Sequence, residues 1–176
     1  MKKDFAAPII VLAAICLVIS LALAVTNSFT EPVIAVNAAE RAETARRALI
    51  PEAEDFAPID ASGLPGSVTD AYGTTNGVGY VFSVSATGYG GSGSLQILVG
   101  LDNDGKIIAV KTLANGETKG IGARVSEPGF EGQFPGKDGS LEGVNAITGA
   151  TISSTAYLGA VRDAFAAYTL VKEAGQ

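Results

Sequence analysis

An apolar run near the N-terminus, residues 5–24, limits what this chain can fold into more than any other feature. No charged residue occurs between Asp4 and Glu31. About twenty such residues are needed for a helix to cross the hydrocarbon core of a membrane. A cleavable signal peptide has a shorter apolar core, roughly 7–15 residues, followed by a small-x-small site, which residues 21–24 match poorly. The sequence therefore favours an uncleaved transmembrane anchor over a signal peptide.

The charges that flank this run predict its orientation. Lys2 and Lys3 precede it, whereas the other flank carries Glu31 and Glu40 before its first arginine. Because positive residues are retained on the cytoplasmic side, we expect a single-pass protein of the cell (inner) membrane with a cytoplasmic N-terminus. The rest of the chain is then extracytoplasmic.

Three regions follow from this reading. Residues 1–29 are the predicted cytoplasmic N-terminus and anchor, and residues 51–176 are the predicted extracytoplasmic domain. Between them, residues 30–50 are expected to form a linker helix that begins at Thr30, with Pro32 in its first turn. The narrow apolar stripe of this helix is explained equally well by packing on a neighbour and by a solvated stalk.

Composition excludes several classes of function. The formal net charge is −6, which argues against nucleic-acid binding. The single cysteine, Cys16, lies in the apolar run, so an internal disulfide and an iron–sulfur cluster held by cysteines are excluded. The chain has no histidine, the commonest metal ligand and general base. We therefore predict no metal site and no conventional hydrolase chemistry.

The domain shows a change from strand-like to helix-like periodicity. Residues 51–77 are expected to be irregular apart from a short strand near Val68. Alternating β-branched and aromatic residues then predict three antiparallel strands, at residues 80–86, 95–101 and 106–113, with a turn at residues 102–105. This order predicts a β-meander.

A final helix is expected over residues 152–172. One of its faces is apolar and is predicted to cover the sheet; it carries Tyr157, Val161, Phe165 and Tyr168. Strands followed by a helix indicate an α+β fold: a transmembrane helix, then a domain with an antiparallel sheet covered by helices.

Three short stretches resemble known ligand-binding motifs but lack a feature that each motif requires. Residues 88–93 match G-x-G-x-x-G, but the dinucleotide fingerprint requires a helix to follow and here a strand is predicted. We expect these glycines to form a turn or to allow a close approach of the backbone to a flat ligand. Residues 102–105 lack the ligand spacing of a calcium loop, and residues 131–138 lack the first glycine and final hydroxyl of a P-loop.

The stretch at residues 145–154 delivers two threonines to the start of the final helix. Unpaired N–H groups and the helix dipole make such a terminus a natural site for a phosphate, and Gly149 lets the backbone approach closely. The residue types in this stretch fit a simpler role equally well, in which Thr148 or Thr151 only caps the helix.

Residues 148–151 (Thr-Gly-Ala-Thr), followed by Ile-Ser-Ser, resemble the flavinylation motif of the FMN-binding domain family, usually written D-x-x-[S/T]-G-A-T. In that family a separate flavin transferase joins the last threonine to the phosphate of FMN. Residues 117–122 also resemble the family's E-T-P-G-L-G segment, which lies against the flavin. The resemblance implies covalent FMN on Thr151 and further cofactor-binding residues at Thr148, Gly149, Ala150, Ser153, Ser154, Glu117, Thr118, Gly120 and Gly122.

The chain departs from the family's pattern at three positions. Asn145 stands where the motif has Asp, Asn115 where the family often has His, and Lys119 where Pro is usual. The first matters most, because a carboxylate near the acceptor hydroxyl helps the transferase to recognise or activate it. Asn keeps the shape of the side chain and loses its charge.

Over nearly its full length the chain resembles the G subunits of Rnf-type electron-transport complexes, and next the C subunit of the sodium-translocating NADH:quinone reductase. The resemblance implies a membrane-anchored FMN electron carrier in an ion-translocating ferredoxin:NAD oxidoreductase complex, relaying electrons between its other membrane and redox subunits. No substrate would turn over on this chain alone. Two alternatives remain: a stand-alone anchored extracytoplasmic flavoprotein and a flavin-free assembly or binding ectodomain.

Overall fold

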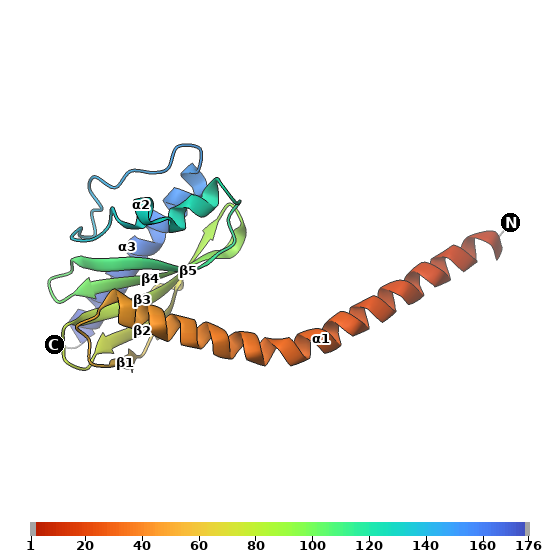
Figure 1. Cartoon of the computed structure of the whole chain (residues 1–176), viewed down its shortest axis with the longest axis horizontal. Coiled ribbons are helices and arrows are strands. Elements are labelled where there is room, and N and C mark those ends of the chain that lie inside the picture. The colour runs from red at the N-terminus through yellow and green to blue at the C-terminus, as the bar shows by residue number, and fades with distance from the viewer. Residues whose placement is uncertain (1–2, 175–176) are drawn as a thin grey trace. The chain divides into compact units, whose positions relative to one another are not determined.

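The computed structural model describes residues 3–174, with side chains from Pro8 onward. The chain divides between Arg41 and Ala42 into two compact units, an N-terminal helical unit and a globular unit (Figure 1). Residues 1–2 of the predicted cytoplasmic N-terminus and residues 175–176 of the predicted domain lie outside the described residues.

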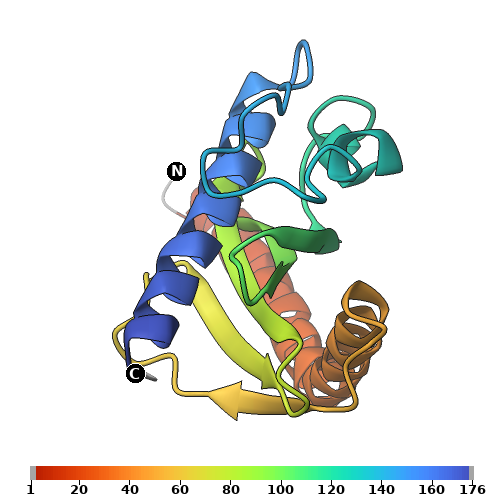
Figure 2. The same ribbon diagram turned by 90° about the vertical axis from the view of Figure 1, so that its left-hand side faces the viewer.

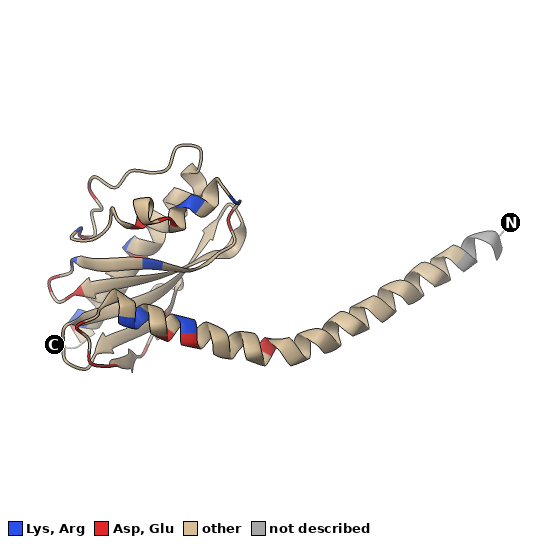
Figure 3. Ribbon diagram, in the orientation of Figure 1, with Lys and Arg blue, Asp and Glu red and all other residues tan. Residues whose placement is uncertain are grey.

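The first unit consists of most of α1, a single helix from Lys3–Leu49 that contains Pro8 and Pro32. Between residue 8 and Glu31 the helix carries no charge (Figure 3). The side chains of this stretch are exposed. The helix is long and apolar enough to span a membrane. A continuous exposed surface of Ile, Leu and Val suits lipid and not water.

The prediction that a separate linker helix begins at Thr30 is wrong, because α1 continues through this position. The Thr30 hydroxyl does not cap a helix; it donates to the carbonyl oxygens of Thr26 and Asn27, at 3.1 and 3.3 Å. Pro32 removes one i→i−4 hydrogen bond, which the surrounding turns tolerate.

The globular unit is built on a five-stranded antiparallel sheet in the order β1-β2-β3-β4-β5. The predicted meander is confirmed as its last three strands, which are longer than expected: β3 (Gly79–Gly88), β4 (Gly91–Asp102) and β5 (Ile107–Asn115). The predicted short strand near Val68 is confirmed as β2 (Val68–Thr74), and β1 (Phe56–Ile59) is a further strand in a stretch that was predicted to be irregular. Pro58 fits in β1 because this strand lies at the sheet edge, where one missing N–H costs no ladder bond.

The helix α3 (Thr151–Ala174) lies across one face of the sheet (Figure 2). Its predicted apolar face is confirmed: Tyr157 and Val161 are fully buried, and Phe165 and Tyr168 pack against the same core. That core includes Phe82, Val84, Leu95, Ile97, Val99 and Leu101 from the two central strands.

The opposite face of the sheet is covered where α1 ends. Leu49 and Ile50 are buried there against Val81 and Leu98. Gly100 makes room for this contact, since a Cβ on it would lie 3.2 Å from Leu49 Cδ2. The sheet is thus covered by helical segments on both faces, and the predicted α+β fold is confirmed.

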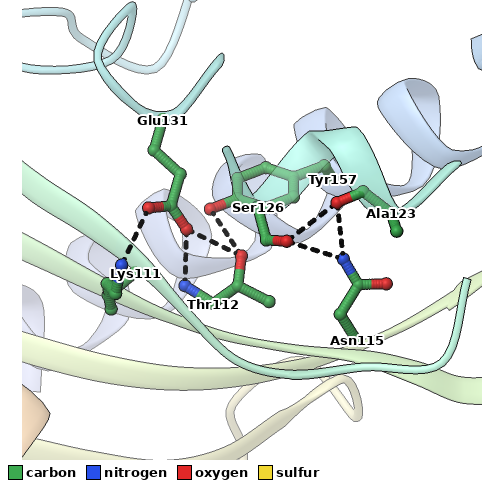
Figure 4. A network of polar contacts seen from close by, with 7 residues as sticks. All are labelled: Lys111, Thr112, Asn115, Ala123, Ser126, Glu131 and Tyr157. Atoms are coloured by element: carbon green, nitrogen blue, oxygen red, sulfur yellow. Dashed lines mark hydrogen bonds and ion pairs between the residues drawn. The ribbon is translucent and has the colours of Figure 1, made fainter. Parts of the chain in front are cut away.

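The segment after β5 is fastened to the edge of that strand. It contains the short helices η1 (Gly122–Ser126) and α2 (Pro128–Glu131). The buried carboxylate of Glu131 accepts hydrogen bonds from Thr112 N at 2.7 Å and from the Thr112 hydroxyl at 2.8 Å, and pairs with Lys111 (Figure 4). Farther along, Ile107 N donates to Lys137 O at 2.8 Å, and Gly136 N donates to Ile107 O at 2.7 Å.

Asn115, which replaces the histidine common in the resembled family, belongs to the same fastening. Its side-chain amide donates to the Ala123 carbonyl oxygen at 3.0 Å and to the Ser126 hydroxyl at 2.9 Å (Figure 4). Its carbonyl oxygen accepts from Glu117 N at 3.0 Å. Asn115 therefore holds η1 and the start of the next loop at the end of β5.

Candidate functional site

A pocket of about 500 Å³ lies at the N-terminal end of α3. Three segments that are distant in the sequence form it: the β3–β4 turn, the loop that leads into η1, and the first turn of α3. The residues that line it are Tyr89, Thr118, Ile121, Gly122, Gly149, Ala150, Thr151, Ile152 and Ser153. Its volume is within the roughly 300–1,000 Å³ common for small-molecule sites.

The pocket has unusually exposed apolar walls. Tyr89, Ile121 and Ile152 are 70%, 53% and 59% exposed, and in the described part of the globular unit only Leu170 is a further large hydrophobic residue of this kind. Three such side chains around one pocket favour a ligand with a flat apolar part. None of the three was predicted from the sequence, although Ile121 and Ile152 lie inside or next to the matched motifs.

The first turn of α3 is open to an anion. Thr151 is its first residue and is exposed. The preceding residue, Ala150, has no side-chain oxygen, and no described side chain accepts a hydrogen bond from the N–H groups of residues 151–153. Thr148 is exposed and its hydroxyl makes no capping hydrogen bond, so Thr148 does not cap α3 in the structure. Free N–H groups and the helix dipole both favour a phosphate here.

Six of the ten predicted cofactor-binding residues line this pocket: Thr118, Gly122, Gly149, Ala150, Thr151 and Ser153. Gly149 has a φ of +83°, a conformation that favours glycine and turns the chain into α3. Thr148 and Gly120 lie outside the lining. Ser154 is buried, and its hydroxyl accepts from Ile147 N at 3.0 Å, which fixes the loop before the helix.

Glu117 does not line the pocket but lies behind its wall, only 5% exposed. Its Oε2 accepts hydrogen bonds from Tyr89 N at 3.0 Å and from the Ser153 hydroxyl. Its Oε1 accepts from Gly90 N at 3.0 Å and from the Ser94 hydroxyl at 2.6 Å. Burial acts to raise the pKa of Glu117, but the hydrogen bonds from Ser153, Ser94 and the two N–H groups outweigh it and lower the pKa.

Residues 88–93 contain the predicted turn between β3 and β4: Gly90 lies in the turn, and the other three glycines lie at the adjoining ends of the two strands. A Cβ on Gly88 would collide with the carboxylate of Glu117, and one on Gly90 would collide with the carbonyl oxygen of Gly116. These two glycines therefore make room for Glu117 and its neighbour.

Asn145 is exposed and does not contact Thr151 through any hydrogen bond of the described residues. Its side-chain amide donates to the Gly143 carbonyl oxygen at 3.3 Å. Its backbone is bound by Gln133.

Comparison with known proteins agrees with this geometry. The FMN-binding domain model matches residues 88–166, which contain every segment of the pocket. The chain is 33% identical to the G subunit of the ion-translocating oxidoreductase complex of Methanosarcina acetivorans, over 93% of this chain and 94% of that protein.

Two further relatives have similar coverage. The G subunit of the Na(+)-translocating ferredoxin:NAD(+) oxidoreductase complex of Acetobacterium woodii is 30% identical over 90% of this chain and 89% of its own length. The G subunit of the proton-translocating ferredoxin:NAD(+) oxidoreductase complex of Clostridium ljungdahlii is 28% identical over 85% of this chain and 83% of its own length. The chain therefore belongs to the family of G subunits of ion-translocating oxidoreductase complexes, with an FMN-binding domain at residues 88–166.

Proposed function

We propose that this protein is the membrane-anchored FMN electron carrier of an ion-translocating ferredoxin:NAD oxidoreductase complex, in which it relays electrons between other redox subunits. FMN is joined through its phosphate to the hydroxyl of Thr151. The observation that carries the proposal is the position of Thr151, exposed at the open first turn of α3 and inside a pocket with apolar walls. The names of two relatives, which include ferredoxin:NAD(+) oxidoreductase, supply the class of complex.

The residues present fit the cofactor. Thr151 and the free N–H groups of the first turn would hold the phosphate, where the helix dipole favours negative charge. Tyr89, Ile121 and Ile152 would contact the ring system, and Thr118 and Ser153 add hydroxyl groups to the lining. FMN supplies the electron-transfer chemistry, while the chain binds and orients it.

The membrane part of the proposal rests on α1. The apolar helix anchors the chain in the bilayer, and Lys2 and Lys3 keep the N-terminus in the cytoplasm. The FMN domain is then extracytoplasmic, where its partners are the other subunits of the complex and a flavin transferase that matures it. A membrane-impermeant amine reagent applied to intact cells should label Lys172 and not Lys2. Labelling of Lys2 alone would show that the protein has the opposite orientation.

Covalent attachment is tested by co-expressing the full chain with a flavin transferase. The wild-type band should fluoresce on a denaturing gel, and its intact mass should rise by FMN less one water. Thr151→Val should abolish both signals. Thr155→Val is the matched control, because Thr155 is exposed one turn farther along α3 and does not line the pocket, and it should retain them. An unmodified wild-type chain, or a fluorescent Thr151→Val variant, would contradict the attachment.

A further inference from the structure

One buried carboxylate connects the two sides of the pocket. The hairpin wall, formed by Tyr89, comes from the β3–β4 turn, and the helix wall comes from residues 149–153 of the lining. Glu117 accepts hydrogen bonds from Tyr89 N and Gly90 N on the hairpin side, and from the Ser153 hydroxyl on the helix side. Among the described hydrogen bonds, no other side chain is shared by these two walls.

The charge of this carboxylate is balanced by dipoles alone. No lysine or arginine of the described residues forms an ion pair with Glu117, whereas the other buried glutamate, Glu131, pairs with Lys111. Four N–H and O–H donors compensate for its removal from water, and it lies beside the positive end of α3.

The charge also lies close to the ligand space. A Cβ placed on Gly122, which lines the pocket, would be 3.0 Å from Glu117 Oε2 and 2.5 Å from Ser153 Oγ. The carboxylate therefore lies next to two residues of the pocket lining, Gly122 and Ser153. In so buried a position, its electrostatic effect on a bound group is weakly screened.

We propose that Glu117 is a positioning residue that holds the hairpin wall and the helix wall in register, and that its buried negative charge lowers the redox potential of the flavin. This proposal rests on the proposed function, because it assumes that FMN occupies the pocket. Adding electrons to the flavin increases its negative charge, and a nearby anion opposes that change. The resembled motif thus contributes a carboxylate that acts from behind the wall and not by contact with the ring.

The positioning role is tested without flavin, on the full chain in detergent, by hydrogen exchange and mass spectrometry. In Glu117→Gln the new amide NH₂ must face either Tyr89 N–H or Gly90 N–H, because each carboxylate oxygen accepts from one of them. Exchange at the β3–β4 turn and in the first two turns of α3 should rise by about tenfold or more, the factor expected for a hydrogen bond to a charged acceptor. The matched control, Glu131→Gln, removes a second buried carboxylate, which is linked to α3 through Thr112 and Tyr157, and it should leave exchange at the β3–β4 turn unchanged. Equal exchange at the turn in wild type and Glu117→Gln overturns the positioning role.

Ser153→Ala removes the hydrogen bond of Glu117 to the helix wall and keeps its hydrogen bonds to the hairpin wall. It therefore tests the two contacts separately, and it remains informative if Glu117→Gln does not fold. It keeps the charge and both hairpin hydrogen bonds, so exchange should rise in the first turns of α3 and stay unchanged at the β3–β4 turn. Unchanged exchange in α3 would contradict the link between the walls.

The electrostatic role is tested on flavin-loaded protein by spectroelectrochemical titration. The flavin of Glu117→Gln should have a more positive potential than that of wild type, and Glu131→Gln should match wild type. An unshifted potential overturns this part of the proposal. If wild type takes up no flavin, the proposed function fails, while the exchange experiment still decides the positioning role.

Discussion

The backbone of Asn145 is held by the side-chain amide of Gln133, which accepts a hydrogen bond from Asn145 N at 2.8 Å and donates one to the Asn145 carbonyl oxygen at 3.3 Å. The position of residue 145 thus depends little on its own exposed side chain. Asn145→Asp should therefore leave the melting temperature unchanged while it restores the carboxylate of the family motif. We expect faster modification by the transferase, measured as the modified fraction in a time course of intact mass. An unchanged time course would show that the carboxylate is not needed here.

Gly122→Ala should damage the pocket, because the new Cβ would lie 2.5 Å from Ser153 Oγ and 3.0 Å from Glu117 Cβ. We expect a loss of about 1–3 kcal/mol in the free energy of unfolding, as for other overpacked sites, together with reduced flavin incorporation. Gly129→Ala is the control, because a Cβ there meets nothing within 4 Å. Chemical denaturation and in-gel fluorescence measure the two effects. Normal incorporation in Gly122→Ala would argue against the proposed place of the cofactor.

Thr112→Val should destabilise the domain without affecting the flavin. It removes the 2.8 Å hydrogen bond to the buried Glu131 carboxylate and preserves the size of the side chain. The expected loss is about 1–3 kcal/mol, because a buried charged acceptor loses one of its donors. Thr155→Val, at an exposed position whose hydroxyl forms none of the described hydrogen bonds, should change stability by no more than about 0.5 kcal/mol. Comparable losses in both variants would contradict the role of the Glu131 contacts.

Acid should weaken the domain partly through Glu117. Its pKa is lower in the folded protein than its ordinary value of 4.5, so its stabilising contribution is complete above the unfolded value. That contribution is lost as the pH falls through the lower folded value. The melting temperature of wild type should therefore fall more steeply than that of Glu117→Gln below about pH 4.5. Parallel curves in this range would show that Glu117 does not contribute to acid sensitivity.

The core of the fold was predictable because its signals are local. Alternation in β3 to β5 and the apolar face of α3 each follow from neighbouring residues. The strand β1 was missed because it contains Pro58, and β2, which was predicted only near Val68, contains Asp70 and Gly73. Both strands form through pairing with the next strand along the chain and not through their own propensity. The continuity of α1 past Thr30 was missed because a threonine two residues before a proline has the same pattern as a helix start.

The site was predictable where a motif contacts the pocket directly, as at Thr118, Gly122 and Thr151. The place of Glu117 behind the wall was not, because two of its donors are backbone N–H groups of the β3–β4 turn. Nothing in the local sequence connects that turn with residue 117. The contact between this turn and residues 116 and 117 also explains why residues 88 and 90 are glycines. This contact is formed only in the folded structure.

The fastening of β5 has a consequence for assembly. An exposed sheet edge can accept a strand from another chain, both in functional complexes and in aggregation. Here Glu131 occupies the N–H of Thr112, and residues 136 and 137 bond to the backbone of Ile107, so this edge is blocked at two points along the strand. Strand addition at β5 is therefore disfavoured, and a neighbouring subunit that contacts this edge must recognise it through side chains and shape.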